Sequence, residues 1–116
     1  MRIVVADETG NVLVEKTLDG GSNNLAELWA VAEAMMFAKN RGIRQIQICT
    51  NSRSVLAWLD GRIGKKLNDR AAVANLMGTI NRLRAHVNVD ATWIPKGKNL
   101  AGSQIRADRR CFVCRL

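Results

Sequence analysis

Two apolar runs and two segments of alternating apolar and polar positions predict four β-strands along the chain. Residues 3–6 and 12–14 are apolar, β-branched runs, and the short loop between them contains Gly10, which suits the positive φ of a tight turn. These two runs therefore predict a β-hairpin. Residues 43–49 and 87–94 also alternate between apolar and polar side chains, and each predicts a further strand.

Apolar residues spaced by three and four predict helices between these strands. The first helix follows a capping loop at 20–24 and ends before Gly42, and the second spans about 53–60. Asn68 or Asp69 is expected to cap a third helix. The apolar faces of the first and third helices are formed by Leu25, Leu28, Val31, Ala32, Met35 and Met36, and by Val73, Leu76, Met77, Ile80 and Leu83.

A last short helix is expected from Asn99 to about Arg109, and residues 110–116 form either a tail or a short strand. A hairpin followed by alternating helices and strands predicts one α/β domain over residues 1–116, with a mixed sheet flanked by helices. The turn at 50–52 leads directly from a strand into a helix. It therefore lies at the carboxyl edge of parallel strands, where α/β proteins form their sites.

The charge is distributed unevenly. The chain carries a net charge of +8, but residues 1–40 have three basic and six acidic residues, whereas residues 41–116 have fifteen basic and four acidic ones. This asymmetry favours a polyanionic partner such as nucleic acid, and the alternative is a charge that serves solubility alone. No apolar run reaches the roughly 18–20 residues of a membrane span, so we expect no membrane partner.

The chain opens without an export signal, so we expect a reducing, cytoplasmic location. Three cysteines cannot form a paired disulfide framework. Cys111 and Cys114 form a Cys-x-x-Cys pair, but with Cys49 and His86 the potential zinc ligands are scattered. Reduced thiols are the simpler interpretation, and redox or zinc chemistry is the alternative.

Three segments carry a resemblance to a known family. They are Ser-Asn-Asn-Leu-Ala-Glu-Leu at 22–28, the strand and turn at 46–54 with Thr-Asn-Ser, and Trp-Ile-Pro-Lys-Gly-Lys-Asn-Leu-Ala-Gly at 93–102. Together, in this order, they resemble the ribonuclease H family of the type 1, reverse-transcriptase-like kind, over roughly residues 1–108. The resemblance implies a ribonuclease H-like fold, truncated at the N-terminus because the family's first strand is missing.

The resemblance also implies a chemistry, which is magnesium-dependent hydrolysis of the RNA strand of an RNA–DNA hybrid. In the family, four acids hold two magnesium ions, which prefer carboxylate oxygens. Here the first acid's strand is absent, the second acid is Glu27, and Asn51 and Gly102 occupy the third and fourth positions. Glu27 alone would be a weak metal ligand at best, and helical periodicity also allows it to be an ordinary surface residue.

We therefore expect no cofactor and no two-metal hydrolysis, with magnesium required only if the enzyme interpretation holds. Asn51 is either natural or an inactivating replacement. What the resemblance still implies is recognition of RNA–DNA hybrid or structured RNA by shape. The residues implied in binding are Ser22, Asn23, Asn24, Ser52, Arg53, Ser54, Arg62, Lys65, Lys66, Asn68, Lys96 and Lys98. Trp29, Trp58 and Trp93 are expected to pack in the core instead of stacking on bases.

The missing first strand should leave a gap between the hairpin and the strand at 43–49. Unpaired strand edges are costly, so something must fill this gap. Residues 110–116 could fold back into it, a second copy or another chain could donate a strand, or the reading frame could be truncated. Three functions follow: an inactive nucleic-acid-binding domain, which we favour; an active hybrid nuclease completed by a homodimer or a strand-donating partner; or a structural subunit of an assembly.

Overall fold

The computed structural model describes residues 1–7, 11–65 and 69–94, and the backbone alone of residues 110–115. The predicted hairpin is confirmed: β1 (Arg2–Asp7) pairs with β2 (Val12–Thr17) in antiparallel register. A register irregularity falls between Val5 and Ala6. β1 is buried on both faces, since Ile3 and Val5 join the main core and Val4 and Ala6, on the opposite face, are also buried.

The first helix, α1 (Asn23–Asn40), follows the predicted bounds closely. The Ser22 hydroxyl accepts a hydrogen bond from the backbone N–H of Leu25 at 3.1 Å and so caps the helix. At the other end Gly42 adopts a φ of +72°, a value that glycine reaches without strain. In its middle, α1 is anchored to the hairpin, because the buried Glu33 forms a 2.6 Å ion pair with Lys16 of β2.

Two parallel strands follow, β3 (Gln45–Thr50) and β4 (Asn88–Trp93), paired residue for residue. The crossover between them contains α2 (Arg53–Leu59) and α3 (Arg70–Leu83). The backbone N–H of Val55 donates to the Ser52 hydroxyl at 3.2 Å, which caps α2. Asp69 precedes α3, but its side chain makes no capping hydrogen bond, so the predicted cap is correct in position and wrong in function.

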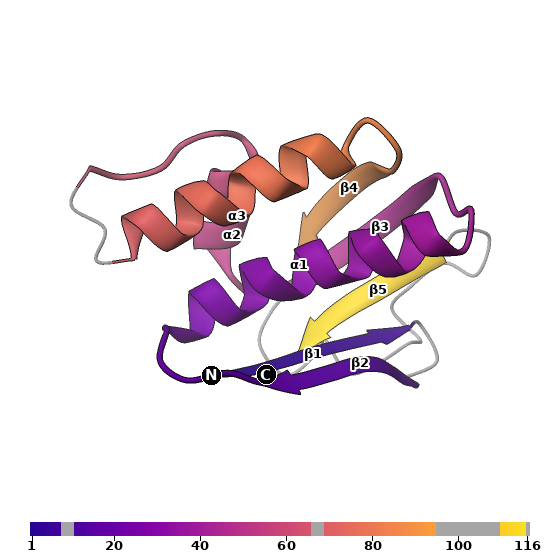
Figure 1. Ribbon diagram of the computed structural model, residues 1–116, viewed down its shortest axis with the longest axis horizontal. Coiled ribbons are helices and arrows are strands. Elements are labelled where there is room, and N and C mark those ends of the chain that lie inside the picture. The colour runs from indigo at the N-terminus through magenta and orange to yellow at the C-terminus, as the bar shows by residue number, and fades with distance from the viewer. Residues whose placement is uncertain (8–10, 66–68, 95–109, 116) are drawn as a thin grey trace.

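The gap predicted beside β3 is filled by the chain itself. β5 (Arg110–Arg115) lies between β1 and β3, antiparallel to the first and parallel to the second. The described strands thus form one sheet in the order β2-β1-β5-β3-β4 (Figure 1). This confirms the fold-back alternative for residues 110–115. The helix and basic turn expected at 95–109 lie outside the described residues.

The helices α1 and α3 lie side by side across one face of the sheet (Figure 1). α1 also contacts β1, β3 and β5, and α2 packs against both other helices and β4. The core between these layers is apolar and includes the fully buried Leu28, Met35, Ile48 and Ile80. The predicted fold class, an α/β mixed sheet flanked by helices, is confirmed. It places the start of α1 and the start of α2 at the same edge of the sheet.

Candidate functional site

The site begins with Glu27, which is only 3% exposed. The surface position that periodicity also allowed is therefore wrong. The helix α1 presses this side chain against the end of β3, where the Thr50 hydroxyl donates a 2.6 Å hydrogen bond to Glu27 Oε1. Thr50 is fully buried. Its role was not expected from the sequence, although its place at the last position of β3 brings it opposite the start of α1.

Burial raises the pKa of Glu27 above its ordinary value of 4.5, because a charged carboxylate loses its hydration there. The hydrogen bond from Thr50 acts in the opposite direction, and so does a hydrogen bond from the backbone N–H of Asn51, since both stabilise the charged form. The balance favours the protonated state more than in water. Asn51 is thus connected to Glu27 through its backbone.

A chain of hydrogen bonds extends from this carboxyl group to both helix starts. The backbone N–H of Ser52 donates to Thr50 Oγ1 at 3.1 Å, and the Ser52 hydroxyl donates to Asn24 Oδ1 at 2.8 Å. Ser52 also caps α2, so its hydroxyl both donates and accepts. The network Glu27–Thr50–Ser52–Asn24 therefore connects α1, β3 and α2 through internal partners.

Next to this network an aromatic and a basic side chain stack at the protein surface. The Arg53 guanidinium lies 4.2 Å from the centroid of the Trp93 ring, at the carboxyl end of β4. Trp93 is 37% exposed, so the expectation that it packs in the core is wrong. Trp58 is buried as expected and Trp29 is half-buried. Trp93 is the last residue of β4, which is an edge strand of the described sheet, and its ring is partly accessible.

Comparison with known proteins identifies the family. A family model described as Reverse transcriptase-like matches residues 1–104. The chain belongs to this family. No curated protein matches it significantly. The ribonuclease H resemblance noted in the sequence is confirmed, and the solved structures that the fold matches carry ribonuclease H names.

One such structure is RNase H1 from the halophilic archaeon Halobacterium salinarum NRC-1, with a TM-score of 0.63, 22% identity, and coverage of 86% of this chain and 76% of that one. Another is the N-terminal RNase H domain of Rv2228c from Mycobacterium tuberculosis, solved as a fusion with maltose-binding protein. Its TM-score is 0.60 at 20% identity, with coverage of 85% and 76%. At these identities the likeness establishes the fold.

Among the described residues, the donor atoms at this Reverse transcriptase-like site do not match a two-magnesium centre. Magnesium ions need several carboxylate or phosphate oxygens between them. Here Glu27 is the carboxylate, Asn51 offers a neutral amide, and β5 brings the sequence Arg-Cys-Phe-Val-Cys-Arg, which contains no acid. Within residues 1–7, 11–65 and 69–94, no group of three or more His, Cys, Asp or Glu side chains could hold a metal ion. Gly102 lies outside the described residues.

The predicted binding residues are only partly brought together. Ser22, Asn23, Asn24, Ser52, Arg53 and Ser54 gather at the two helix starts, with Asn23 and Arg53 exposed. Arg62 and Lys65 follow the far end of α2, about 10 Å away along that helix. Lys66, Asn68, Lys96 and Lys98 lie outside the described residues.

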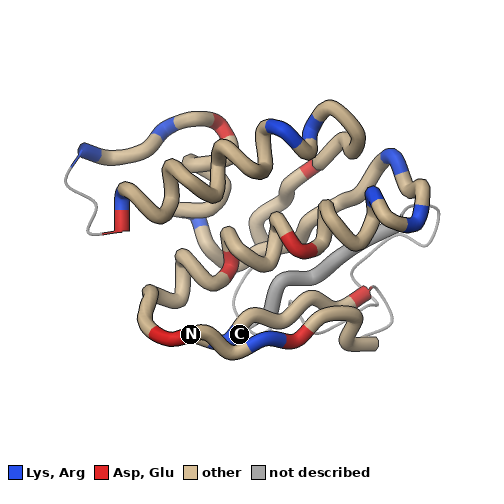
Figure 2. The backbone as a smooth tube through the Cα atoms, viewed as in Figure 1, with Lys and Arg blue, Asp and Glu red and all other residues tan. Residues whose placement is uncertain are grey.

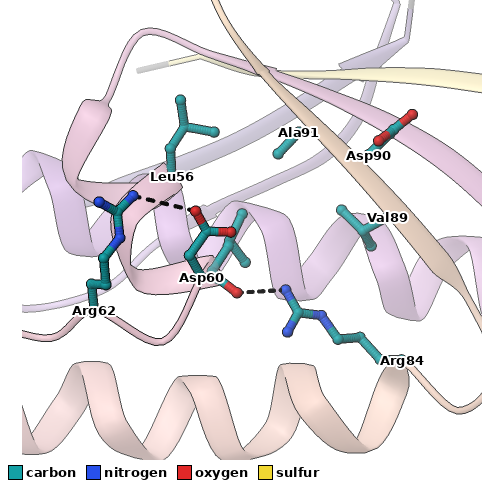
Figure 3. A pocket seen from close by; sticks show the side chains of 8 residues that line it. Leu56, Asp60, Arg62, Arg84, Val89, Asp90 and Ala91 are labelled. Carbon is teal, nitrogen blue, oxygen red and sulfur yellow. Dashed lines mark hydrogen bonds and ion pairs between the residues drawn. The ribbon is translucent and has the colours of Figure 1, made fainter.

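The Arg62 guanidinium is engaged by a neighbouring side chain. It forms an exposed 3.3 Å ion pair with Asp60, and Figure 3 shows both side chains among those that line a pocket of about 420 Å³. On the other side of this pocket Arg84 donates to the Leu59 carbonyl oxygen at 2.9 Å. Asp60 and Asp90 give the pocket a mixed charge, so it is less suited to an anion than the edge around Arg53.

Proposed function

We propose that this chain binds RNA–DNA hybrid or structured RNA at the edge formed by the starts of α1 and α2, and that it does not cleave its ligand by two-metal hydrolysis. The observation that carries the absence of cleavage is the hydrogen bonding of Glu27. Its carboxyl group is buried and engaged by the Thr50 hydroxyl and the Asn51 backbone N–H. A carboxyl group held in this way, with a raised pKa, serves the packing of α1 against β3.

The charge balance supports the absence of hydrolysis. Two divalent cations bring four positive charges, and the one carboxylate that the described part of the site offers, beside a neutral amide, offsets at most one of them. Glu27 and Asn51 are the family's acid positions within the described residues, and neither helix start brings another acid to them.

Binding is supported by the exposed groups around the same network. Asn23 and Arg53 are exposed next to the two helix starts, and amide and guanidinium groups are suited to RNA hydroxyls and phosphates. The Arg53–Trp93 pair adds an accessible ring and a cation at the end of β4. The excess of basic residues after residue 40 supplies a long-range attraction to a polyanion.

The active-nuclease alternative needs a partner that donates both a strand and acids. β5 already occupies the position between β1 and β3, which removes the open edge that such a partner would fill. The structural-subunit alternative predicts stable assembly without affinity for nucleic acid. We keep a reducing, cytoplasmic setting within the proposal, supported by the free, buried thiol of Cys49. No helix among the described residues is long and apolar enough to cross a membrane.

Fluorescence anisotropy with a labelled RNA–DNA hybrid tests the proposal. The affinity should fall steeply as salt rises. The logarithm of the association constant, plotted against the logarithm of the salt concentration, should have a slope of about −0.7 to −0.9 for each phosphate contacted. Arg53→Gln should weaken binding and reduce the magnitude of that slope by about one. Arg41→Gln is the matched control, because it removes the same charge from an exposed residue at the C-terminal end of α1, about 27 Å along the helix from its start. Binding that ignores salt, or equal losses in both variants, would refute the proposed interface.

A further inference from the structure

We propose a second phosphate-binding site at the opposite edge of the sheet, in a pocket lined by Lys39, Arg44 and His86. The pocket has a volume of about 380 Å³ and lies between the end of α1, the loop into β3 and the turn from α3 to β4. Its ligand would be a phosphate group, either of a free phosphorylated compound or of a nucleic-acid backbone.

The backbone around this pocket is fixed by its own hydrogen bonds. The N–H of Ile43 donates to the Ala38 carbonyl oxygen at 2.9 Å, which closes the end of α1. The N–H of Asn88 donates to the Arg44 carbonyl oxygen at 2.7 Å and ties the starts of β3 and β4 together. The backbone N–H of His86 donates to the Leu83 carbonyl oxygen at 2.9 Å and holds this residue at the end of α3. Three separate elements therefore hold the lining residues in place.

The charged side chains that the structure describes in this pocket are all basic and have no internal partner among the described residues. Lys39, Arg44 and His86 are exposed, and within the described residues none of their side chains makes a hydrogen bond or an ion pair. No Asp or Glu of the described segments lines the pocket, in contrast to the pocket at Asp60. Figure 2 shows basic positions gathered where α1 turns into β3.

A simpler role for Lys39 is neutralising the negative end of the α1 dipole. Two of the last carbonyl groups of α1, those of Ala38 and Lys39, are, however, already engaged. Ala38 O accepts from the N–H groups of Arg41 and Ile43, and Lys39 O accepts from that of Gly42. The Lys39 ammonium, the Arg44 guanidinium and an imidazole N–H are thus available together, and they suit a tetrahedral oxyanion that can accept several hydrogen bonds.

This site is independent of the proposed function. Arg44 immediately precedes β3 and Asn51 immediately follows it, so the length of the strand, roughly 20 Å, separates the pocket from the edge around Ser52. One phosphate group cannot contact both edges. Failure of hybrid binding at Arg53 would leave the pocket's affinity for phosphate unchanged, and the reverse also holds.

Proton NMR of the His86 ring provides the test, because the chain contains one histidine and its ring signals are unambiguous. Sodium phosphate is added at constant pH, and sodium chloride of equal ionic strength serves as the reference. We expect a saturable movement of the His86 signals with phosphate alone. Lys39→Gln or Arg44→Gln should weaken phosphate binding about tenfold, the loss expected for one charge-assisted hydrogen bond.

Arg70→Gln is the charge-matched control, because Arg70 is an exposed residue at the other end of α3, and it should leave the affinity within about twofold of the original protein. A short oligonucleotide that moves His86 more strongly than inorganic phosphate identifies a nucleic-acid backbone as the source, and the reverse order identifies a free phosphorylated compound. The proposal is overturned if chloride moves the signals equally, if neither probe moves them, or if Arg44→Gln and Arg70→Gln behave alike.

Discussion

Replacing Glu27 by Gln distinguishes a packing carboxyl group from a metal ligand. Gln has nearly the same size and keeps a side-chain oxygen that can accept from Thr50 Oγ1, 2.6 Å away, and from the Asn51 backbone N–H. What it removes is the charge. Because burial raises the pKa of Glu27, the folded protein holds a proton on this group at pH values where the unfolded chain has already lost it.

The sign of the pH dependence follows from that difference. Below the ordinary value of 4.5, Glu27 is protonated in both states and imposes no penalty. As the pH rises through 4.5 and then through the higher pKa of the folded state, the original protein loses stability by at most about 1.4 kcal/mol per pH unit from this group. The Gln variant lacks this pH-dependent loss of stability. Its stability relative to the original protein should therefore increase between pH 4.5 and the folded-state pKa of Glu27, and then level off.

Denaturant unfolding at a series of pH values, followed by far-UV circular dichroism, measures both curves. Glu33→Gln is the matched control, since Glu33 is also a buried acid of α1 but accepts a 2.6 Å ion pair from Lys16. Removing that charge should lower stability near neutral pH, opposite in sign to the change at Glu27. The reasoning is refuted if Glu27→Gln becomes less stable relative to the original protein as the pH rises. Millimolar magnesium that stabilises the original protein but not Glu27→Gln would equally contradict it.

Three further outcomes follow from the structure. Ser52→Ala removes the cap of α2 and the partner of Asn24, so thermal unfolding should show a loss of about 1–2 kcal/mol, and an unchanged melting temperature would contradict the network. Trp93→Ala should weaken binding of a hybrid with an unpaired overhang more than binding of a blunt hybrid, because unpaired bases stack on exposed rings. Equal losses of affinity for the two hybrids, measured by anisotropy, would exclude stacking. Val113→Pro should lower stability by about 3 kcal/mol or more, because it removes a hydrogen bond from a strand paired on both sides. Val12→Pro in the edge strand β2 should lower stability less. Similar losses of the two variants in urea unfolding would argue against a central β5.

Much of the fold could be predicted from local pattern alone. Period-two alternation locates β3 and β4, and the spacing of Leu28 and Met35 locates α1, because both patterns reflect burial of one face. The hairpin is equally local. The position of β5 is different, since pairing between residues 46–49 and 110–113 depends on chain segments far apart in sequence. The sequence therefore left the fold-back as one of several alternatives.

The candidate site was predictable in position and less so in detail. The family motifs identify Glu27 and Ser52, but whether a carboxyl group at the border of an apolar face is buried depends on what packs above it. Thr50 was missed because a Thr at a strand end has many ordinary roles, and its link to Glu27 crosses from one element to another. Trp93 was misjudged for a related reason: aromatic residues are usually buried, but the last residue of a strand can emerge from the sheet.

The most direct test of the central claim is a cleavage assay on an end-labelled RNA–DNA hybrid, with magnesium present and the protein in excess over the concentration that saturates binding. The hydrogen bonding of Glu27 and the neutral amide of Asn51 predict that the bound RNA strand stays intact over hours. Appearance of RNA fragments that require magnesium and disappear in Glu27→Gln would show that the chain assembles a working metal centre, and would contradict the account.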